Sequence, residues 1–390
     1  MQNKNSATFL LILIGSLCAF PPFTTDLYLP ALPSLTVYFK TMPALVQTSL
    51  TMSMTGLALG QLFVGPLSDK FGRKKLLFIS LICFFISTIL CIISPSIGVF
   101  NTMRLIQGMS ASGGVVIARS IATDKCRGKV LTKFLALASA INGIAPITAP
   151  VIGGIILTFV DWRGTFAILL LYGILLLLAT LHLQESLPEH RRSQKSVFSN
   201  FTTYWTVLKN KNYLVFFAVS TFSFISFFAY ISASSFILQE GYGLSPVLYS
   251  ICFAINAIAT GIGCALSSKF RSEKSNLIFG GTFSLVASAL VALALLNHAS
   301  IILLECAFVI MMFSFGCLQP VTNALALNSE RKNAGTASAA LGAASFLMGS
   351  IVTPVVGMGD MFRNLSLISV VGALLVFFTA LYAASALNKS

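Results

Sequence analysis

The stretch GPLSDKFGRKK, residues 65–75, lies between two apolar runs and decides how the chain folds. It holds four basic residues and one acid, whereas residues 43–64 before it and 76–94 after it carry no charged residue. A run of about 20 apolar residues is long enough to cross the hydrocarbon core of a bilayer as a helix. We therefore predict that residues 65–75 form a loop at a membrane surface and join two transmembrane helices.

The same alternation of apolar runs and short charged segments continues through all 390 residues. Hydrophobic residues make up 56% of the chain and charged residues only 9%, against about 25% charged residues in soluble domains. The pattern predicts an all-α membrane protein with twelve transmembrane helices. The predicted spans cover residues 7–38, 43–64, 76–94, 98–122, 130–158, 164–184, 212–239, 245–267, 275–297, 299–327, 333–358 and 364–386.

The first span has two special features. It contains Pro21, Pro22, Pro30 and Pro33, so we expect it to bend. Its start also resembles a signal peptide, but eleven further spans favour a retained first helix.

Basic residues are distributed unevenly between the two sides of the predicted membrane. With a cytoplasmic N-terminus, twenty of the 25 Lys and Arg residues fall in inner segments, and only Lys40, Arg163 and Arg363 fall in outer ones. Cytoplasmic loops carry an excess of Lys and Arg, so both termini are predicted in the cytoplasm. The net charge of +14 is spread over these short loops, which argues against a nucleic-acid partner.

Two internal matches divide the chain into halves. LSDKF at 67–71 resembles LSSKF at 266–270, 199 residues later, and APVIG at 149–153 resembles TPVVG at 353–357, 204 residues later. Transporters commonly contain such repeats and hold substrate near the midplane between them. We predict two pseudo-symmetric six-helix halves, residues 1–184 and 212–390. The segment between them, 185–211, is either a solvated linker or a helix on the inner membrane surface.

Other function classes find little support in the sequence. The eight cysteines are scattered without paired spacing, so neither a disulfide framework nor a metal site is expected. His182, His190 and His298 are dispersed near loops, which argues against catalytic residues and an enzyme. Because there is no nucleotide-binding loop of the Walker type, we expect neither ATP as the energy source nor any other cofactor.

The loop at 65–75 has a chemistry beyond its positive charge. Gly65 and Gly72 permit a tight turn, and Asp69 is expected to accept backbone N–H groups at a helix N-terminus. Arg73 is expected to pair with an acid such as Asp124 at the end of the fourth span. These residues together predict a conformational latch, whereas the alternative is a basic loop that only sets the topology.

This loop resembles the signature of the major facilitator superfamily. RLIQG at 104–108 is similar to the family's fourth-helix motif, and APVIGG at 149–154 is similar to its fifth-helix antiporter motif, with Ala149 where Gly is usual. DLYLPALP at 26–33 and AGTAS at 334–338 resemble more closely the bicyclomycin/chloramphenicol-resistance branch.

The resemblance implies a monomeric exporter in the bacterial inner membrane. Members of that branch are proton-coupled drug exporters, so small amphiphilic drugs, protons and antibiotic resistance are implied here. The alternative is a same-fold importer, a symporter of a metabolite or an iron chelate, because the direction of transport is poorly encoded in a sequence.

Ionisable residues inside the spans are the main site candidates, since each costs about 2.5–3.5 kcal/mol or more to bury in a bilayer. Asp26 is predicted to be the carboxylate that binds a proton or a cationic substrate, and the alternative is a structural acid near the outer interface. Arg104, with Gln107 one turn further on, either lines the cavity and tunes Asp26 or reaches outward. Arg119 lies nearer the inner end and is a candidate partner of lipid phosphate. Glu305 is a second proton candidate or a buried structural partner.

Two further groups of residues complete the predicted site. Polar residues within the spans are expected either to contact substrate or to bond across helices; they are Tyr28, Asn142, Tyr230, Asn256, Gln319 and Asn323. Pro150, Gly153 and Gly154 are expected to form a hinge or a seal against leakage, or else to serve ordinary helix packing.

Overall fold

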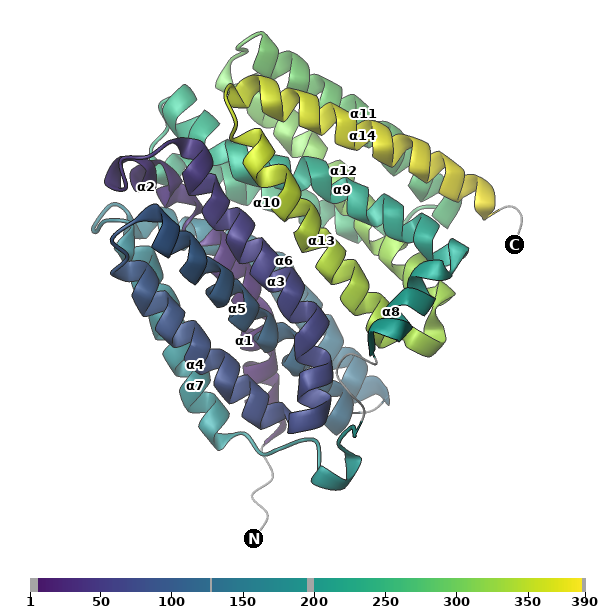
Figure 1. Ribbon diagram of the computed structural model, residues 1–390. Coiled ribbons are helices and arrows are strands. Elements are labelled where there is room, and N and C mark those ends of the chain that lie inside the picture. Colours follow the sequence, from purple (N-terminus) through teal and green to yellow (C-terminus); the bar gives the residue numbers. More distant parts are fainter. Residues whose placement is uncertain (1–5, 127, 195–199, 388–390) are drawn as a thin grey trace. The chain divides into compact units, whose positions relative to one another are not determined.

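The computed structural model describes residues 6–126, 128–194 and 200–387, with the backbone alone at residues 7, 128–140, 142, 200 and 201. These described residues form helices joined by short connections and contain no strand (Figure 1). The chain divides into two compact units, each of which we describe by itself. Unit 1 comprises Met1–Thr41 and Met52–Phe201, and unit 2 comprises Met42–Thr51 and Thr202–Ser390.

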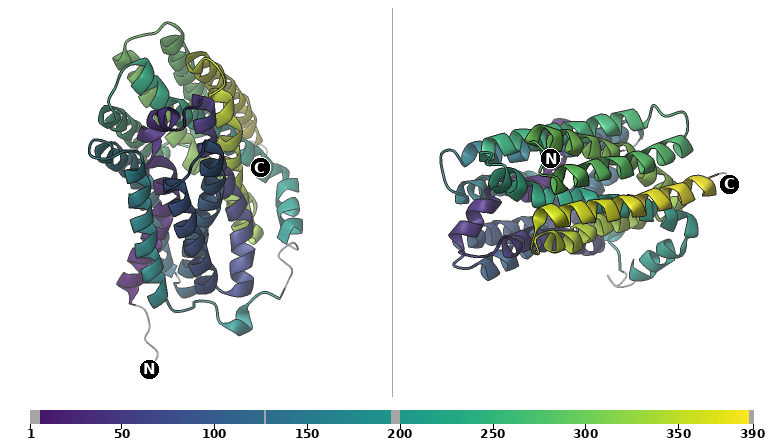
Figure 2. Two further views of the ribbon diagram at one scale, coloured as in Figure 1. Left: turned by 60° about the vertical axis from the view of Figure 1, so that its left-hand side comes forward. Right: turned by 90° about the horizontal axis from the view of Figure 1, so that it is seen from above.

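Unit 1 is a bundle of long helices that lie side by side (Figure 2). Its helices are α1 (Ala7–Asp26), α2 (Leu32–Tyr38), α3 (Pro43–Phe71), α4 (Arg73–Ile92), α5 (Ile97–Lys125), α6 (Gly128–Ile156) and α7 (Arg163–His182). The first nine residues of α3 belong to unit 2.

The bend expected in the first span is present. The helix α1 contains Pro21 and Pro22 and ends at Asp26, and a 3₁₀ turn at Leu29–Ala31 leads into α2. Asp26 and the two threonines before it therefore lie where regular helical hydrogen bonding stops.

Unit 2 contains the linker helix and the remaining long helices. They are α8 (Asn200–Lys209), α9 (Lys211–Phe236), α10 (Pro246–Ser267), α11 (Glu273–Leu296), α12 (Ile301–Ser329), α13 (Ala334–Val356) and α14 (Met361–Ala386). The predicted linker segment thus contains the helix α8. Val207 of this helix is buried in the apolar core of unit 2, whereas Trp205 is exposed beside Lys209.

Ten helical segments of the described chain are long and apolar enough to cross a membrane. The prediction of an all-helical membrane protein is confirmed. The helices α5 and α6, each 29 residues long, are not among these ten: α5 is rich in polar and small residues, and Gly143–Ile156 is the apolar stretch of α6 in which the structure describes the side chains. The count of twelve spans therefore stays a prediction.

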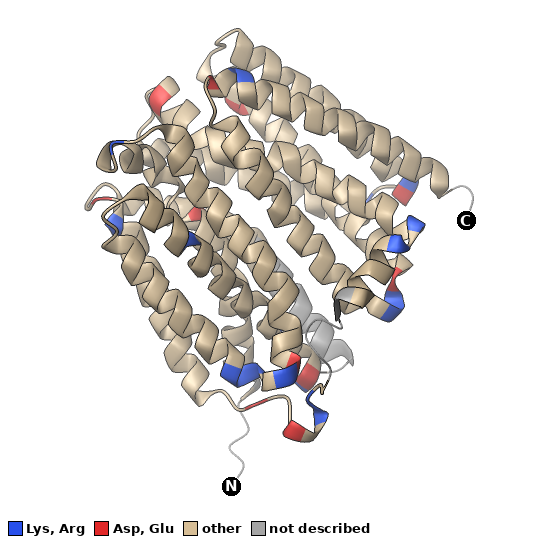
Figure 3. Ribbon diagram, viewed as in Figure 1, with Lys and Arg blue, Asp and Glu red and all other residues tan. Residues whose placement is uncertain are grey.

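Charged residues mark the ends of the helices in unit 1. Figure 3 shows Lys and Arg gathered where α3 meets α4, with a second, smaller group at the opposite end. Lys70, Arg73, Lys74 and Lys75 make the first group. Arg104 is the exception, because it lies well inside the α5 helix and has no exposed surface.

Reciprocal glycine contacts hold two helix pairs together. In unit 1, a Cβ on Gly56 would lie 2.1 Å from the Leu105 carbonyl oxygen, and a Cβ on Gly108 would lie 2.1 Å from the Ser53 carbonyl oxygen. In unit 2, a Cβ on Gly263 would lie 2.3 Å from the Phe313 carbonyl oxygen, and a Cβ on Gly316 would lie 2.1 Å from the Thr260 carbonyl oxygen. Backbones that touch this closely leave no room for a side chain, so small residues set the spacing of α3 to α5 and of α10 to α12.

We expect Gly263→Ala to destabilise the protein by about 1–3 kcal/mol, because the added carbon must push α12 away from α10. Gly261→Ala is the matched control on the same helix, since nothing lies within 4 Å of a Cβ there. Thermal unfolding of the purified protein in detergent measures both variants. Equal midpoints for the two variants would contradict the glycine contact.

Candidate functional site

The signature stretch 65–75 is mostly helical. The α3 helix continues to Phe71 and α4 starts at Arg73, so the predicted loop narrows to Gly72 alone. Gly72 has a φ of 97°, a conformation that L-residues with side chains rarely adopt. A Cβ at Gly72 would also lie 2.6 Å from a carboxylate oxygen of Glu185. Gly72 therefore permits the sharp reversal of the chain, whereas Gly65 is an ordinary residue within α3.

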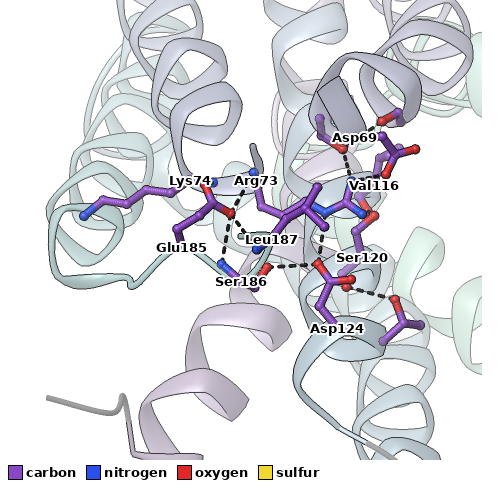
Figure 4. Close-up of polar contacts among 12 residues, drawn as sticks. Asp69, Arg73, Lys74, Val116, Ser120, Asp124, Glu185, Ser186 and Leu187 are labelled. Carbon is purple, nitrogen blue, oxygen red and sulfur yellow. Dashed lines mark hydrogen bonds and ion pairs between the residues drawn. The ribbon is translucent and has the colours of Figure 1, made fainter. Parts of the chain in front are cut away.

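Arg73 lies at the centre of an ion-pair network (Figure 4). Its Nη1 is 2.6 Å from Asp69 Oδ1 and its Nε is 3.1 Å from Asp124 Oδ2. The same Nη1 donates to the hydroxyl of Ser68 at 2.5 Å. The side chains of Arg73 and Asp124 are only 8% and 12% exposed, so this pair is better shielded from solvent than a surface ion pair. The expected contact between Arg73 and Asp124 is present and joins α4 to the end of α5.

Glu185 takes the capping role that we had expected of Asp69. Its two carboxylate oxygens accept the backbone N–H groups of Arg73 and Lys74 at 3.0 and 3.1 Å, which are free donors in the first turn of α4. Asp69 instead lies in the last turn of α3 and pairs with Arg73. Our sequence analysis missed Glu185, and its signal was modest: it is the first charged residue after the sixth apolar run.

A second segment closes the network from the same side. The Ser186 hydroxyl donates to Asp124 Oδ2 at 3.0 Å, and the N–H groups of Ser186 and Leu187 donate to Glu185 Oε1 (Figure 4). The chain that leaves α7 is thus held against the α3–α4 turn and the end of α5. Through Arg73, Asp124 and Glu185, these contacts hold together the ends of α3, α4, α5 and α7.

Arg104 is enclosed by polar and aromatic groups rather than by a carboxylate. It donates to the amide oxygen of Gln107 and, at 3.0 Å, to the backbone carbonyl of Thr24. Its guanidinium carbon lies 4.2 Å from the ring centre of Tyr28, which is a favourable position for a cation over an aromatic face. Among the described residues, no carboxylate lies within 4.0 Å of Arg104. Arg104 thus has no exposed surface in this structure, and its tuning of Asp26 stays a prediction.

Gln107 and Thr88 extend this network to a further helix. The amide nitrogen of Gln107 donates to the Thr88 hydroxyl on α4 at 2.7 Å, and both side chains are fully buried. Arg119, by contrast, is exposed on α5.

Asp26 ends α1 and is 6% exposed. The Thr25 hydroxyl donates to its Oδ1 at 2.7 Å, and no basic side chain of the described chain lies within 4.0 Å of it. Arg104 approaches it indirectly, through the carbonyl of Thr24, two residues earlier in the chain. The structure therefore has Asp26 beside the Arg104 network but not in an ion pair with it.

The antiporter-like motif packs directly behind this carboxylate. A Cβ on Gly153 would lie 1.9 Å from the carbonyl oxygen of Leu27, the residue that follows Asp26. Gly154 is also buried, and Pro150 lies within α6. Gly153 therefore lets α6 pack closely on the end of α1.

Unit 2 holds a separate polar group around Asn256. Its amide nitrogen donates to the Tyr230 hydroxyl at 2.9 Å and to Glu305 Oε1 at 2.8 Å. These three residues, which were predicted separately, come together from α9, α10 and α12. Gln319 and Asn323 form another group, in which both side chains bond to Ser220 on α9. The side chain of Asn142 lies outside the described residues.

In the described part of the chain, no three His, Cys, Asp or Glu side chains lie close enough together to bind a metal ion.

Comparison with known proteins agrees with the motifs. The family model of the Major Facilitator Superfamily matches residues 12–354. The MFS-type transporter YdgK of Bacillus subtilis is 36% identical over 357 residues, which cover 90% of this chain and 89% of that protein. A bicyclomycin resistance protein homolog of Haemophilus influenzae is 28% identical and covers 98% of this chain and 97% of its own.

A solved structure shares the fold. The crystal structure of a D-xylose-proton symporter superposes with a TM-score of 0.76 at 17% identity, over 95% of this chain and 98% of that one. At that identity the likeness concerns the fold alone. The family match over most of the chain and the close relative together establish that this chain belongs to the Major Facilitator Superfamily and is a multi-pass membrane transporter, not an enzyme.

Proposed function

We propose that this protein exports small amphiphilic compounds in exchange for entering protons. The observation that carries the proposal is Asp26, a buried carboxyl group that adjoins the Arg104 network and whose one side-chain partner within the described part of the chain is the Thr25 hydroxyl. A buried, unpaired carboxylate is costly, and binding a proton or a cation removes that cost. The resemblance to a bicyclomycin resistance protein homolog supports drugs as the exported compounds.

The membrane potential supplies enough energy for this exchange. A proton that moves down the potential gains about 2.3 kcal/mol per 100 mV. Asp26 would bind a proton from outside in one state and release it inside in the other, with Arg104 as the nearby positive charge that favours release. Gln107 and Tyr28 would hold Arg104 in place during both steps.

We further propose the architecture in which this exchange takes place. Twelve spans would form two six-helix halves, residues 1–184 and 212–390, in the bacterial inner membrane with both termini in the cytoplasm. The glycine contacts support the repeat: Gly263 follows Gly56 by 207 residues, and Gly316 follows Gly108 by 208. Alternating access would rock the two halves about a central cavity.

We expect Asp26→Asn to abolish proton-driven export while leaving exchange of substrate without a gradient intact, because the amide keeps the shape but cannot carry a proton. Proteoliposomes with an imposed pH gradient and a cationic, a neutral and an anionic compound provide the measurement. Asp161→Asn is the control, since this exposed carboxylate pairs with Arg163 at the start of α7. Full proton-driven export by Asp26→Asn would sink the assignment. Substrate uptake in step with proton entry would show the importer instead.

The ion pairs of Arg73 with Asp69 and Asp124, together with the chain reversal at Gly72, would act as the conformational latch. Removing Arg73 leaves two carboxylates without their shared cation, so the state in which the network is intact loses stabilisation. The latch would therefore set how the protein divides between inward-open and outward-open states.

We expect Arg73→Ala to shift the inward/outward balance without abolishing substrate binding. Labelling rates of single cysteines at the inner and outer ends of the cavity-facing helices report that balance. Lys75→Ala is the control, because it removes a basic charge from the same turn at an exposed position. Labelling rates that stay the same in Arg73→Ala would contradict the latch.

A further inference from the structure

One carboxylate ties together three helices at one end of unit 2. Glu330 directly follows α12, and each of its two carboxylate oxygens accepts an amide N–H group. Asn210 donates to Oε1 at 2.6 Å, and Asn333 donates to Oε2 at 3.1 Å. Asn210 directly precedes α9, and Asn333 directly precedes α13. The ends of α9, α12 and α13 therefore meet at these three side chains, which we call the Glu330 clasp.

Asn210 is also the single residue between the linker helix α8 and α9. Its Oδ1 accepts the backbone N–H groups of Asn212 at 3.0 Å and of Tyr213 at 3.4 Å, and thereby caps α9. Its Nδ2 donates to Glu330 and also to the Ser329 carbonyl at 3.1 Å, at a helix end where carbonyl groups lack partners within the helix. A shift of the junction between α8 and α9 relative to α12 breaks these bonds.

The helix α8 depends on contacts of this kind for its order. It is ten residues long, and an isolated helix of that length is only marginally stable in water. Val207 is its one fully buried side chain among those that the structure describes, whereas Trp205 and Lys209 are exposed. The packing of Val207 and the bonds of Asn210 are therefore what hold α8 on unit 2.

The position of Glu330 corresponds to that of Asp124 in unit 1. Glu330 follows Asp124 by 206 residues, within the range of 199 to 208 residues that separates the other matches between the halves. Asp124 pairs with Arg73, but the residue 199 positions after Arg73 is Ser272, which caps α11. Within the described chain, no basic side chain lies within 4.0 Å of the Glu330 carboxylate. Unit 2 thus has the acid without the arginine, and two asparagines take its place.

This difference makes the Glu330 clasp easier to open than the Arg73 network. Asn210, Glu330 and Asn333 are only half-buried, so water can replace the amide donors when the clasp opens. Opening the Arg73 network separates opposite charges, and the Arg73 side chain is only 8% exposed. The Glu330 clasp can therefore form and break without leaving a buried charge unpaired.

We propose that the Glu330 clasp is a second latch, within unit 2, which couples the order of the linker helix α8 to the positions of α12 and α13. While the clasp is closed, Asn210 holds the junction of α8 and α9 against the end of α12. When these helix ends separate, Asn210 loses Glu330 and α8 is released. The latch role rests on the alternating access proposed above, whereas the coupling of α8 to the clasp does not.

Substitution of Asn210 tests the coupling. Asn210→Asp keeps a side chain that caps α9 but places a second carboxylate against Glu330, so repulsion replaces the hydrogen bond. Hydrogen–deuterium exchange of residues 200–209, measured by mass spectrometry on the purified full-length protein in detergent, is expected to become about tenfold faster, the loss expected for a hydrogen bond to a charged group. Asn212→Asp is the control, because it adds the same charge at an exposed position in the first turn of α9 and should leave this exchange unchanged.

A swapped pair shows whether the effect comes from the contact itself. When Asn210→Asp is combined with Glu330→Gln, the new amide donates to the new carboxylate in the reverse direction, and its oxygen still accepts from Asn333. This double variant is expected to restore most of the slow exchange. Exchange that is equal in Asn210→Asp and the unaltered protein, or a double variant that exchanges as fast as Asn210→Asp, would overturn the proposal.

Cysteine labelling distinguishes a latch from a contact that only orders the linker helix. Asn210→Asp is expected to shift the inward/outward balance in the assay described for Arg73→Ala, and the swapped pair is expected to restore it. A balance that moves in Arg73→Ala but not in Asn210→Asp would overturn the second latch alone. Labelling rates that move in neither variant would overturn the alternating access on which both latches rest.

Discussion

The buried charge of Arg104 constrains the arrangement of the helices in unit 1. An arginine held away from water in a membrane costs about 2.5–3.5 kcal/mol or more, so its donors must be met inside the protein. Thr24 lies in the last turn of α1, where carbonyl groups lack partners within the helix, and its carbonyl accepts from Arg104. Gln107 and the ring of Tyr28 complete the surroundings. The end of α1, the chain after it and α5 thus meet around one guanidinium group, whose Nη1 and Nη2 have hydrogen-bond partners and whose Nε has none.

Glycine contacts decide how close the other helices come to this centre. In lipid there is no hydrophobic force between apolar helices, so direct backbone packing holds them together. Gly153 brings α6 against the carbonyl of Leu27, next to Asp26. A larger side chain at this position would push α6 away and open the region behind the carboxylate. The motif glycine and the candidate proton carrier therefore belong to one structural element, although 127 residues separate them in the sequence.

The sequence predicted the elements that depend on local pattern. The apolar runs located the long helices, the prolines located the break after Asp26, and the acid at the end of the fourth run located the partner of Arg73. Glu185 was missed because the N-terminus of α4 is capped by a residue 112 positions later in the chain, and no spacing encodes that meeting. The grouping of Tyr230, Asn256 and Glu305 was hidden for the same reason. Polarity within a span indicates that a partner is needed, but only packing determines which one.

The surroundings of Asp26 and Glu305 differ in their charge. Asp26 lies beside the Arg104 network without pairing with it, so its ionised form has a positive charge nearby but no ion pair. Glu305 is held by an amide and, through it, a phenol, which are neutral groups. Its negative charge lacks a matching cation among the described residues. The nearby positive charge offers Asp26 the partial compensation that the proposed cycling of a proton requires, whereas the neutral groups around Glu305 offer its charge none.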